Sequence, residues 1–577
     1  MKELMLGNAA VARGLYEAGC RFVSSYPGTP STEITEQSAL YPEIYAEWAP
    51  NEKVAMESAF GASLAGRRSF CGMKHVGLNV AADPLFTLSY TGVNAGMVIA
   101  VADDAGMHSS QNEQDSRHYA RAAKVPMFSP SDSAEALAMT REAFEVSETF
   151  DTPVLLKMCT RVSHSQSLVE TAPREEHEKG YQKDAAKYIM MPGFAKRRHP
   201  IVEERTRRLA EYAETCPWNR IEDGTDHAIG IVTDSTSYQY VKEALGELYP
   251  VLKIGMTFPL CERKIRDFCA SVQKVIVVEE LDGFLEQQLH DFGIPAEGKS
   301  RFGLIGEFSQ NTIRRAFEKE VREGAVLPQE IPARPPVMCA GCPHRGLYYV
   351  LKKMNLTVLG DIGCYTLGAV APLNAVDSTI CMGASVSGAH GFVKALGQQA
   401  QKNTVAVIGD STFMHSGMTG LVNIAYNDSK ATVIILDNSI TGMTGHQQNP
   451  TTGKNLKGDP AAAVDLEALC RAIGIERVRV VDPYDLAAVE TALKEELDAP
   501  CASVIISRRP CALLKYVKHP GPIEVRSDLC RGCRACMKIG CPAISMKEGK
   551  VILDQTLCTG CGVCEQLCRF GALGGNV

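Results

Sequence analysis

The sequence has 577 residues, of which 45% are hydrophobic and 22% charged, and its 60 Lys and Arg against 67 Asp and Glu give a net charge of −7. This composition is typical of a globular protein and excludes a disordered or fibrous chain, while the length predicts about three to five domains. The negative net charge offers no overall surface for nucleic acid. Because the first residues lack a signal peptide's apolar core and no run of 18 apolar residues occurs, we expect a cytoplasmic protein that does not enter a membrane.

Apolar strands alternate with helical stretches along most of the chain, a rhythm typical of doubly wound parallel sheets. The fold class is therefore multidomain α/β. Charged, irregular sequence predicts a connector with surface helices over 174–187 and 195–214, and a proline-rich stretch predicts a linker. In chain order, the predicted segments are a first α/β domain (1–170), the connector (171–225), a smaller α/β domain (226–310), the linker (311–337), a third α/β domain (338–515) and a cysteine-rich domain (516–577).

Two loops of the third α/β domain carry oxygen ligands for a cation. Gly409, Asp410 and Ser411 follow one predicted strand, and Asp437 and Asn438 follow the next. Because the carboxyl ends of parallel strands flank the ligand crevice of a doubly wound sheet, Asp410 and Asn438 can converge on one cation. Oxygen ligands suit Mg²⁺, and glycine-rich turns would let backbone amides approach a diphosphate bound to it.

This pattern resembles the thiamine diphosphate fingerprint, in which a Gly-Asp-Gly turn is followed by an asparagine pair. Ser411 replaces the last glycine here, and Asp437 replaces the first asparagine. The resemblance implies a diphosphate-type domain in which the main-chain carbonyl of Ile440 is the third protein ligand of Mg²⁺. A purely local role for these turns is the alternative. The expected cofactor-binding positions are Glu52, Gly363, Gly383, Gly409, Asp410, Ser411, Asn438, Ile440 and Thr441.

The first α/β domain holds the catalytic candidates, and it resembles a pyrimidine-type thiamine diphosphate-binding domain. Glu52, in NEKVAMESAFGASLAG, resembles the glutamate that promotes loss of the C2 proton of thiamine. A helix cap is the alternative. Thr29, in SSYPGTPSTEI, resembles the threonine of 2-oxoacid:ferredoxin oxidoreductases that reaches the substrate carboxylate, and a proline-flanked turn is the alternative. Further groups that face either the substrate or the surface are His75, the third catalytic candidate, with His108, Gln111 and Glu113.

The C-terminal segment carries two C-x-x-C-x-x-C triplets, which begin at Cys530 and Cys558. It resembles a two-cluster bacterial ferredoxin, in which each four-iron four-sulfur cluster takes its fourth ligand from the other half of the repeat. The four-residue gap before Cys541 and the Arg569 that follows Cys568 depart from that pattern. Structural zinc and disulfides are the alternatives. The ligand sets that the resemblance implies are Cys530, Cys533, Cys536 and Cys568, and Cys558, Cys561, Cys564 and Cys541.

A third group of cysteines lies in the third α/β domain, partly in the C-x-x-C of MCAGCPHR. In related ferredoxin oxidoreductases, matching positions hold a cluster near thiamine, so the resemblance implies a third cluster. Small buried core thiols are the alternative. The four positions are Cys339, Cys342, Cys364 and Cys511.

The order of these domains resembles the alpha subunit of indolepyruvate:ferredoxin oxidoreductase over essentially the whole chain, with a transketolase C-terminal-like domain second. The motifs are YPGTPSTE, NEKVAMESAFGASLAG, GMHSSQNEQDSR, CAGCPHRG, GDIGCYTLG and GDSTFMHSG. The resemblance implies oxidative decarboxylation of an aryl 2-oxoacid with coenzyme A, giving an arylacetyl-CoA and carbon dioxide, and a beta subunit in a heterotetramer of two alpha and two beta chains. Electrons would leave for ferredoxin.

Two other functions stay open at this point. One is a non-oxidative thiamine-dependent 2-oxoacid decarboxylase, and the other is an electron-transfer or scaffold subunit whose catalytic centre lies on a partner. From residue 521 onward, seven Lys and Arg stand against five Asp and Glu. This balance favours either docking of an acidic redox partner or ordinary solubilising charges.

Overall fold

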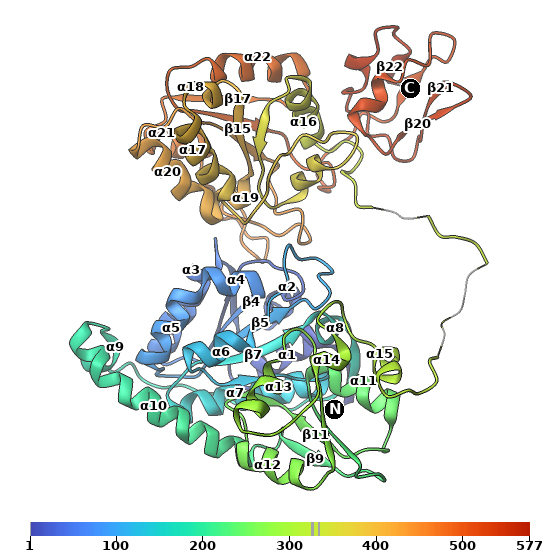
Figure 1. Cartoon of the computed structure of the whole chain (residues 1–577). Coiled ribbons are helices and arrows are strands. Elements are labelled where there is room, and N and C mark those ends of the chain that lie inside the picture. Colours follow the sequence, from blue (N-terminus) through green and yellow to red (C-terminus); the bar gives the residue numbers. More distant parts are fainter. Residues whose placement is uncertain (1, 323, 325–327, 333–334, 577) are drawn as a thin grey trace. The chain divides into compact units, whose positions relative to one another are not determined.

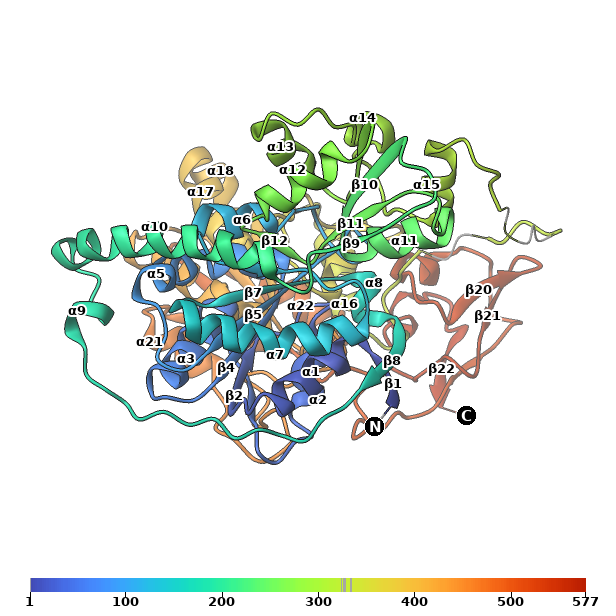
Figure 2. The same ribbon diagram turned by 90° about the horizontal axis from the view of Figure 1, so that it is seen from below.

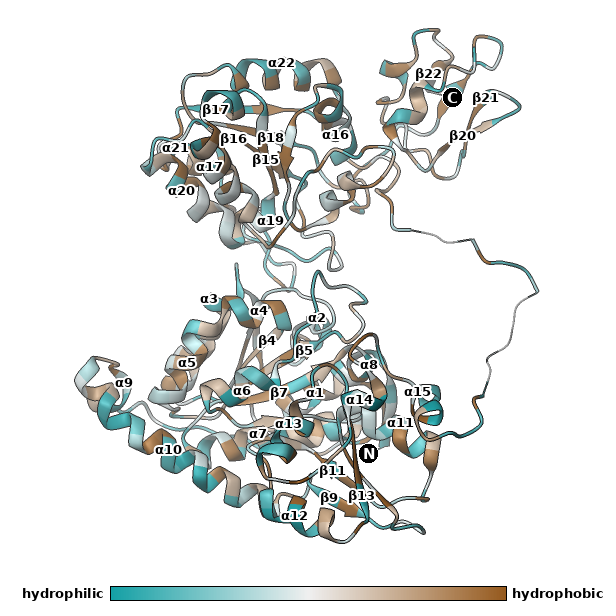
Figure 3. Cartoon of the chain, in the orientation of Figure 1, coloured by the Kyte–Doolittle hydropathy of each residue, from teal (hydrophilic) through white to brown (hydrophobic). Residues whose placement is uncertain are grey.

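A computed structural model describes residues 2–322, 324, 328–332 and 335–576, so the predicted linker at 311–337 lies partly outside the described residues. The chain forms two compact units, Met1–Pro328 (unit 1) and Gln329–Val577 (unit 2), and each is described by itself (Figure 1). Hydrophobic residues line the strands, and hydrophilic residues gather on helices such as α10 and α12 (Figure 3). No helix in the described part of the chain is long and apolar enough to cross a membrane.

Unit 1 is built on a seven-stranded sheet in the order β12-β6-β7-β5-β4-β2-β3, which is parallel except for β12. Along β5, Val98 and Ala100 belong to one buried cluster and Ile99 and Val101 to another, because alternate residues of a strand point to opposite faces. Helices α7 and α6 lie on opposite sides of this sheet (Figure 2). Burial of both faces is typical of a doubly wound parallel sheet, which confirms the predicted fold class.

The strands of this sheet are β2 (Phe22–Ser25), β3 (Tyr45–Trp48), β4 (Ser69–Lys74), β5 (Met97–Asp103), β6 (Met127–Phe128), β7 (Val154–Cys159) and β12 (Met256–Phe258). Strands β1 (Lys2–Leu6) and β8 (Gln166–Glu170) pair separately in an antiparallel ribbon. The helices are α1 (Gly7–Glu17), α2 (Thr32–Ser38), α3 (Glu52–Leu64), α4 (His75–Val80), α5 (Ala82–Thr91), α6 (Arg117–Ala123), α7 (Ser133–Phe150) and α8 (Thr160–His164).

The second α/β region of unit 1 has its own four-stranded sheet in the order β13-β10-β11-β9. It is not separate from the first, because β12 pairs with β6 and Val232, Leu252 and Val277 belong to the same buried cluster as β5. Helix α15 packs here through Ile313, although it was predicted to lie in the linker. The elements are β9 (Arg220–Glu222), β10 (Ile229–Asp234), α11 (Ser235–Leu245), β11 (Val251–Ile254), α12 (Glu262–Ala270), β13 (Lys274–Val278), α13 (Phe284–Asp291), α14 (Lys299–Phe302) and α15 (Gln310–Ala316).

One of the two helices predicted in the connector is present in the structure. Helix α10 (Pro192–Thr215) confirms the helix expected over 195–214, and it buries Val202 and Leu209. The helix expected over 174–187 is wrong, since only α9 (Ala185–Tyr188) is helical there. Residues 174–184 run extended along unit 1, where the Glu175 N–H donates to the Glu17 carbonyl and the Lys179 N–H to the Gly66 carbonyl. Backbone groups that bond to a neighbouring surface are not available to a helix.

Unit 2 contains a five-stranded parallel sheet in the order β14-β15-β16-β18-β17. Residues of β15 again alternate between two buried clusters, Val405 and Val407 in one and Ala406 and Ile408 in the other. The elements are α16 (His344–Lys353), β14 (Thr357–Leu359), η1 (Cys364–Ala369), α17 (Ala384–Leu396), α18 (Gln398–Gln401), β15 (Thr404–Gly409), α19 (Asp410–Thr412), the π-helical turn η2 (Phe413–Gly417), α20 (Met418–Tyr426), β16 (Thr432–Asp437), α21 (Leu466–Ala472), β17 (Arg477–Val481), α22 (Leu486–Leu497) and β18 (Ser503–Arg508).

The cysteine-rich tail, predicted as a domain of its own over 516–577, shares a core with this sheet domain. Ile523, Ile539 and Val563 pack in one cluster with Leu347 and Leu486. A buried arginine, Arg345, donates from its guanidinium to the carbonyls of Ile539 and Gly540. The tail elements are β19 (Ile523–Val525), η3 (Ala535–Ile539), β20 (Ile544–Lys547), β21 (Lys550–Leu553), η4 (Glu565–Leu567) and β22 (Leu573–Asn576).

Candidate active site and metal centres

Asp410 is a buried carboxylate at the carboxyl end of a central strand. Strand β15 ends at Gly409, and the helical run of α19, η2 and α20 begins at Asp410. Burial, followed by the charge of Asp437, raises the pKa of Asp410 to about 7. Its neighbours are neutral donors, the Ser411 N–H at 2.8 Å and the Thr451 hydroxyl at 3.3 Å. A buried carboxylate whose partners are neutral suits a metal cation as its missing counter-charge.

Asn438 lies in the loop that follows the neighbouring strand β16. Its amide Nδ2 is 3.3 Å from Nε2 of His344, and its Oδ1 accepts the Ile440 N–H at 3.3 Å. Burial lowers the pKa of His344 to about 4. The Thr441 hydroxyl donates to the Ser411 hydroxyl oxygen at 2.9 Å, which ties this loop to the turn after β15. The predicted oxygen ligands therefore stand on two loops that are bonded to one another, and we call residues 438–442 the cation loop.

Three polar residues of this region were not predicted from the sequence. The Thr451 hydroxyl donates to Asn449 Oδ1 at 2.7 Å, and the Asn449 side chain is hydrogen-bonded to Asp410. The carboxylate of Asp361 is fully buried and accepts the N–H groups of Gly383 and Ser385, both at 3.0 Å. The signals for them are the polar run HQQNPTTG after a buried strand and the Asp361 of GDIGCYTLG.

Glycines that were expected to approach a diphosphate pack closely in unit 2. Gly383 has a φ of 88°, and a Cβ there would lie 2.6 Å from the Cβ of Ser416. A Cβ on Gly363 or Gly409 would lie 2.4 or 2.6 Å from the ring of Tyr365. Side chains at these positions would clash, so each turn keeps a bare backbone.

Glu52 is the first residue of α3 in unit 1, where Asn51 caps the helix by accepting the Val54 N–H at 2.9 Å. Its side chain is 5% exposed, and a Cβ on Gly77 would lie 2.6 Å from its Oε1. Burial raises the pKa of Cys71 well above its usual range, and the charge of Glu52 adds to that rise. Because Asn51 is the cap, the alternative of a helix-capping Glu52 is not needed to explain its position.

His75 and Thr29 come from adjoining parts of unit 1. The buried His75 has Nε2 at 3.2 Å from the Asn112 carbonyl, while its Nδ1 has no hydrogen-bond partner among the described residues. Gly28, which precedes Thr29, lies against the Cβ of Lys74, and Lys74 donates to the Ser109 carbonyl at 2.6 Å. Lys74 was not predicted, although it precedes His75 directly. The side chains of His75 and Lys74 therefore both bond to the loop that follows β5.

The remaining loop candidates have structural partners or face outward. His108 lies 3.1 Å from Glu307, which also accepts from Arg161. Glu113 accepts the Gly106 N–H at 2.7 Å, and Gln111 is exposed. These contacts favour the surface interpretation for His108 and a loop-stabilising role for Glu113.

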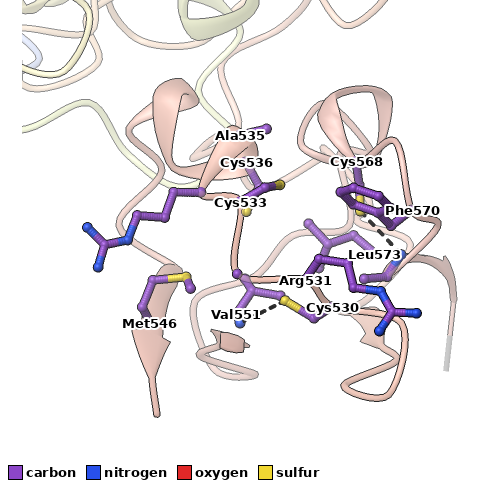
Figure 4. A pocket seen from close by; sticks show the side chains of 13 residues that line it. Cys530, Arg531, Cys533, Ala535, Cys536, Met546, Val551, Cys568, Phe570 and Leu573 are labelled. Atoms are coloured by element: carbon purple, nitrogen blue, oxygen red, sulfur yellow. Dashed lines mark hydrogen bonds between the residues drawn. The ribbon is translucent and has the colours of Figure 1, made fainter. Parts of the chain in front are cut away.

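The eight tail cysteines line two cavities. One is lined by Cys530, Cys533, Cys536 and Cys568 together with Met546 and Phe570 (Figure 4). The other is lined by Cys541, Cys558, Cys561 and Cys564. Burial raises the pKa of Cys536, and the charges of Cys533, Cys568 and Cys530 add to that rise. The grouping is the one that the ferredoxin resemblance implies, with Cys568 and Cys541 each crossing to the other half.

The third cysteine group gathers beside the cation loop. Burial raises the pKa of Cys364 to about 11, with contributions from Cys511 and Cys339, and it raises that of Cys342 to about 12, with contributions from Cys339 and Cys364. The Cys511 N–H donates to the Asn438 carbonyl at 2.9 Å. Gly341, between Cys339 and Cys342, lines the cavity of Cys541. Thiols gathered in this way suit a soft metal centre.

Comparisons with known proteins agree with this geometry. Family models match for a thiamine pyrophosphate enzyme C-terminal binding domain over 361–507, a pyruvate flavodoxin/ferredoxin oxidoreductase thiamine diphosphate-binding domain over 13–215 and a 4Fe-4S binding domain over 551–574. Indolepyruvate oxidoreductase subunit IorA of Archaeoglobus fulgidus is 39% identical over 611 residues, which cover 99% of this chain and 97% of that protein. The chain belongs to the IorA family.

A second IorA protein, from Thermococcus kodakarensis, is 40% identical over 630 residues and covers 99% of this chain and 96% of its own. A solved 2-oxoglutarate:ferredoxin oxidoreductase from Magnetococcus marinus is 18% identical, with a TM-score of 0.47 over 56% of this chain and 65% of its own. The IorA relatives and the three family models show that this chain is part of a 2-oxoacid oxidoreductase that uses thiamine diphosphate and iron–sulfur clusters, oxidatively decarboxylates its 2-oxoacid and transfers electrons to ferredoxin.

Proposed function

We propose that this chain oxidises aryl 2-oxoacids of the indolepyruvate and phenylpyruvate type with coenzyme A, forming an arylacetyl-CoA and carbon dioxide. The observation that carries the proposal is the third cysteine group beside the cation loop, where the Cys511 N–H meets the Asn438 carbonyl. A thiamine site needs an adjacent electron acceptor only if its reaction is an oxidation. The aryl class of substrate is supported by the relatives, which are named indolepyruvate oxidoreductase subunits.

The cofactor would lie at the ends of β15 and β16. Asp410, the Asn438 amide oxygen and the Ile440 carbonyl would hold Mg²⁺, because oxygen ligands suit that ion and the hydrogen-bond donors at the buried Asp410 are neutral. Thiamine diphosphate supplies, when bound, the electron-accepting carbon centre at which a 2-oxoacid loses carbon dioxide. The backbone positions proposed against its diphosphate are Gly363, Gly383, Gly409, Ser411 and Thr441.

Unit 1 would supply the proton chemistry. Glu52 would hold and return a proton at the pyrimidine ring, and the close approach of Gly77 keeps its carboxylate in one place. His75 would contact the substrate, because its buried Nδ1 has no hydrogen-bond partner among the described residues and could accept from a bound hydroxyl. Thr29 would contact the substrate carboxylate, as the family resemblance implies.

Three groups of cysteines would each hold a four-iron four-sulfur cluster, which when bound supplies a one-electron carrier. The first cluster would be held by the third cysteine group, the second by the Cys541 set and the last by the Cys530 set. Gly341 adjoins the first two, since a Cβ on it would lie 2.3 Å from Thr559 Oγ1, beside Cys558. The charge of Cys536 contributes to the raised pKa of Cys564, mainly caused by burial, which links the last two sets.

The proposed partners are a smaller beta subunit, two copies of each chain forming the heterotetramer, and a soluble ferredoxin in the cytoplasm. Arg531 and Arg534 line the rim of the last cavity, and Cys533 there is exposed. An acidic carrier would be attracted to this rim. Salt would weaken the attraction, because exposed charges more than about 8 Å apart are largely screened at physiological ionic strength.

The test is anaerobic purification of the chain with its partner subunit, followed by analysis of iron, thiamine and Mg²⁺. A panel of aryl, aliphatic and dicarboxylic 2-oxoacids with coenzyme A then reports ferredoxin reduction. We expect fast reduction with indolepyruvate or phenylpyruvate only when coenzyme A is present. Aldehyde release without ferredoxin reduction would instead identify a non-oxidative decarboxylase, and a complex without thiamine would identify a scaffold subunit.

A further inference from the structure

His344 connects the third cysteine group to the cation loop. It is the first residue of α16, it follows Cys342 and Pro343 directly, and it is 4% exposed. Its Nε2 lies 3.3 Å from Asn438 Nδ2. The nitrogen of an amide only donates hydrogen bonds, so Nε2 of His344 must accept here.

Two hydrogen bonds define the orientation of the Asn438 amide, one to Ile440 and one to His344. Its Oδ1 accepts the Ile440 N–H at 3.3 Å, so Nδ2 is the atom that points to His344. If the amide turned over, its Nδ2 would face the Ile440 N–H, so two donors would meet inside the core, which is costly, and His344 would have to carry its proton on Nε2 instead. With His344 in place, the amide oxygen stays on the side of Ile440, whose carbonyl is the other proposed loop ligand.

His344 and the cation loop each contact residues of the third cysteine group. The backbone N–H of His344 is hydrogen-bonded to the thiol of Cys342, and the Cys511 N–H donates to the Asn438 carbonyl at 2.9 Å. A Cβ on Gly442 would be 3.4 Å from Cys364 Sγ. Two of the four cysteine positions, Cys511 and Cys364, thus lie against the cation loop itself. Cys342 is linked to it through His344, which contacts Cys342 through its backbone and Asn438 through its side chain.

We propose that His344 is a positioning residue that turns the Asn438 oxygen toward the cation, and that it couples loading of the third cysteine group to binding of the metal and diphosphate. The inference rests on the proposed function of this site. Partners that orient a metal ligand typically change metal affinity by about 10-fold to 100-fold when they are removed. Because coupling between two sites is reciprocal, a bound diphosphate should in turn change the properties of the cluster.

The experiment uses the anaerobic, cluster-loaded complex of this chain with its partner subunit. Mn²⁺, a spectroscopic substitute for Mg²⁺, is titrated in the presence of thiamine diphosphate, and free Mn²⁺ is read by electron paramagnetic resonance. His344→Leu should weaken Mn²⁺ binding by about 10-fold to 100-fold. His344→Gln, whose Oε1 can accept from Asn438, should retain most of the affinity, whereas His344→Asn, whose shorter side chain ends near Nδ1, should not.

Tyr348→Phe is the matched control, because Tyr348 is buried one turn further along α16 and its hydroxyl has no hydrogen-bond partner in the described part of the chain. It should bind Mn²⁺ like the wild type. In the wild type, thiamine diphosphate with Mg²⁺ should also shift the resonance signal of one reduced cluster, and His344→Leu should reduce that shift.

Wild-type affinity in His344→Leu with full iron content would overturn the proposal. If His344→Leu does not retain its clusters, the Gln and Asn variants decide, and equal affinities for both would overturn it. A wild-type complex that binds neither Mn²⁺ nor thiamine diphosphate would instead refute the proposed function of the site, so the two failures are distinguishable.

Discussion

Replacing Asp410 by Asn should stabilise the thiamine-free protein while abolishing cofactor binding. Asp410 is 2% exposed, and burial followed by the charge of Asp437 raises its pKa from 3.8 to about 7. This rise corresponds to about 4 kcal/mol, at about 1.4 kcal/mol for each tenfold change in ionisation. The Asn variant has nearly the same shape but carries no charge, so it avoids the cost of ionising a buried group.

The sign of the pH dependence follows from the raised pKa. Stability that Asp410 contributes is fully present below about pH 3.8, the unfolded value, and is lost as the pH rises through about 7. The stability advantage of Asp410→Asn over the wild type should therefore be larger at pH 8 than at pH 5, by about 3 kcal/mol. Imperfect hydrogen bonds of the Asn side chain to Ser411 and Thr451 would lower the stability of the variant by about 1 kcal/mol at every pH, so the difference between pH 5 and pH 8 would not change.

The assay is thermal unfolding of thiamine-free, cluster-loaded wild type and variant at pH 5, 6, 7 and 8. For a unit of this size, a gain of about 3 kcal/mol corresponds to a relative rise in melting temperature of about 6 to 12 °C. In the wild type, affinity for Mg²⁺ with thiamine diphosphate should also fall below about pH 7, because protons compete for the carboxylate. A melting difference that does not change with pH would show that Asp410 is not held uncharged by burial, and a variant that still binds the cofactor would show that Asp410 is not a ligand of its metal.

Three further substitutions test other parts of the account. Glu52→Gln should keep thiamine diphosphate but lose turnover, because an amide cannot exchange the proton; normal deuterium exchange at C2 of thiamine would contradict this. Gly77→Ala would place a Cβ 2.6 Å from Glu52 Oε1, so turnover should fall by about a hundredfold with cofactor affinity retained; unchanged kcat would show that the carboxylate position is not critical. Cys541→Ser should remove the cluster of the Cys558 set and leave that of the Cys530 set, as read by iron content and resonance spectra; loss of the Cys530 cluster instead would reverse the pairing.

The sequence predicted best what depends on local spacing. The cysteine triplets and the Gly-Asp turn after β15 are short patterns, and their residues gather where a parallel sheet or a ferredoxin repeat would bring them. Asn449 and Thr451 could not be found in this way, because they reach Asp410 only through the path of a long loop. Their positions depend on tertiary folding rather than on spacing.

Errors arose where backbone groups bond outside their own segment. Residues 174–184 are rich in helix-forming charged residues, yet their N–H groups bond to Glu17 and Gly66 in unit 1. The tail was predicted as a separate domain over 516–577, but Arg345 and Ile539 join it to the sheet domain. In the first case tertiary contacts override helix propensity, and in the second they join two segments that were predicted as separate domains.

The central claim is that electrons released from an aryl 2-oxoacid at the thiamine site enter this chain's own clusters. The most direct test mixes the anaerobic complex with indolepyruvate and coenzyme A, without ferredoxin, freezes it within one turnover and counts reduced clusters against carbon dioxide released. In the wild type, we expect the clusters to gain two electrons for each carbon dioxide released, and in Asp410→Asn we expect no cluster reduction. Carbon dioxide release with all clusters still oxidised would contradict it.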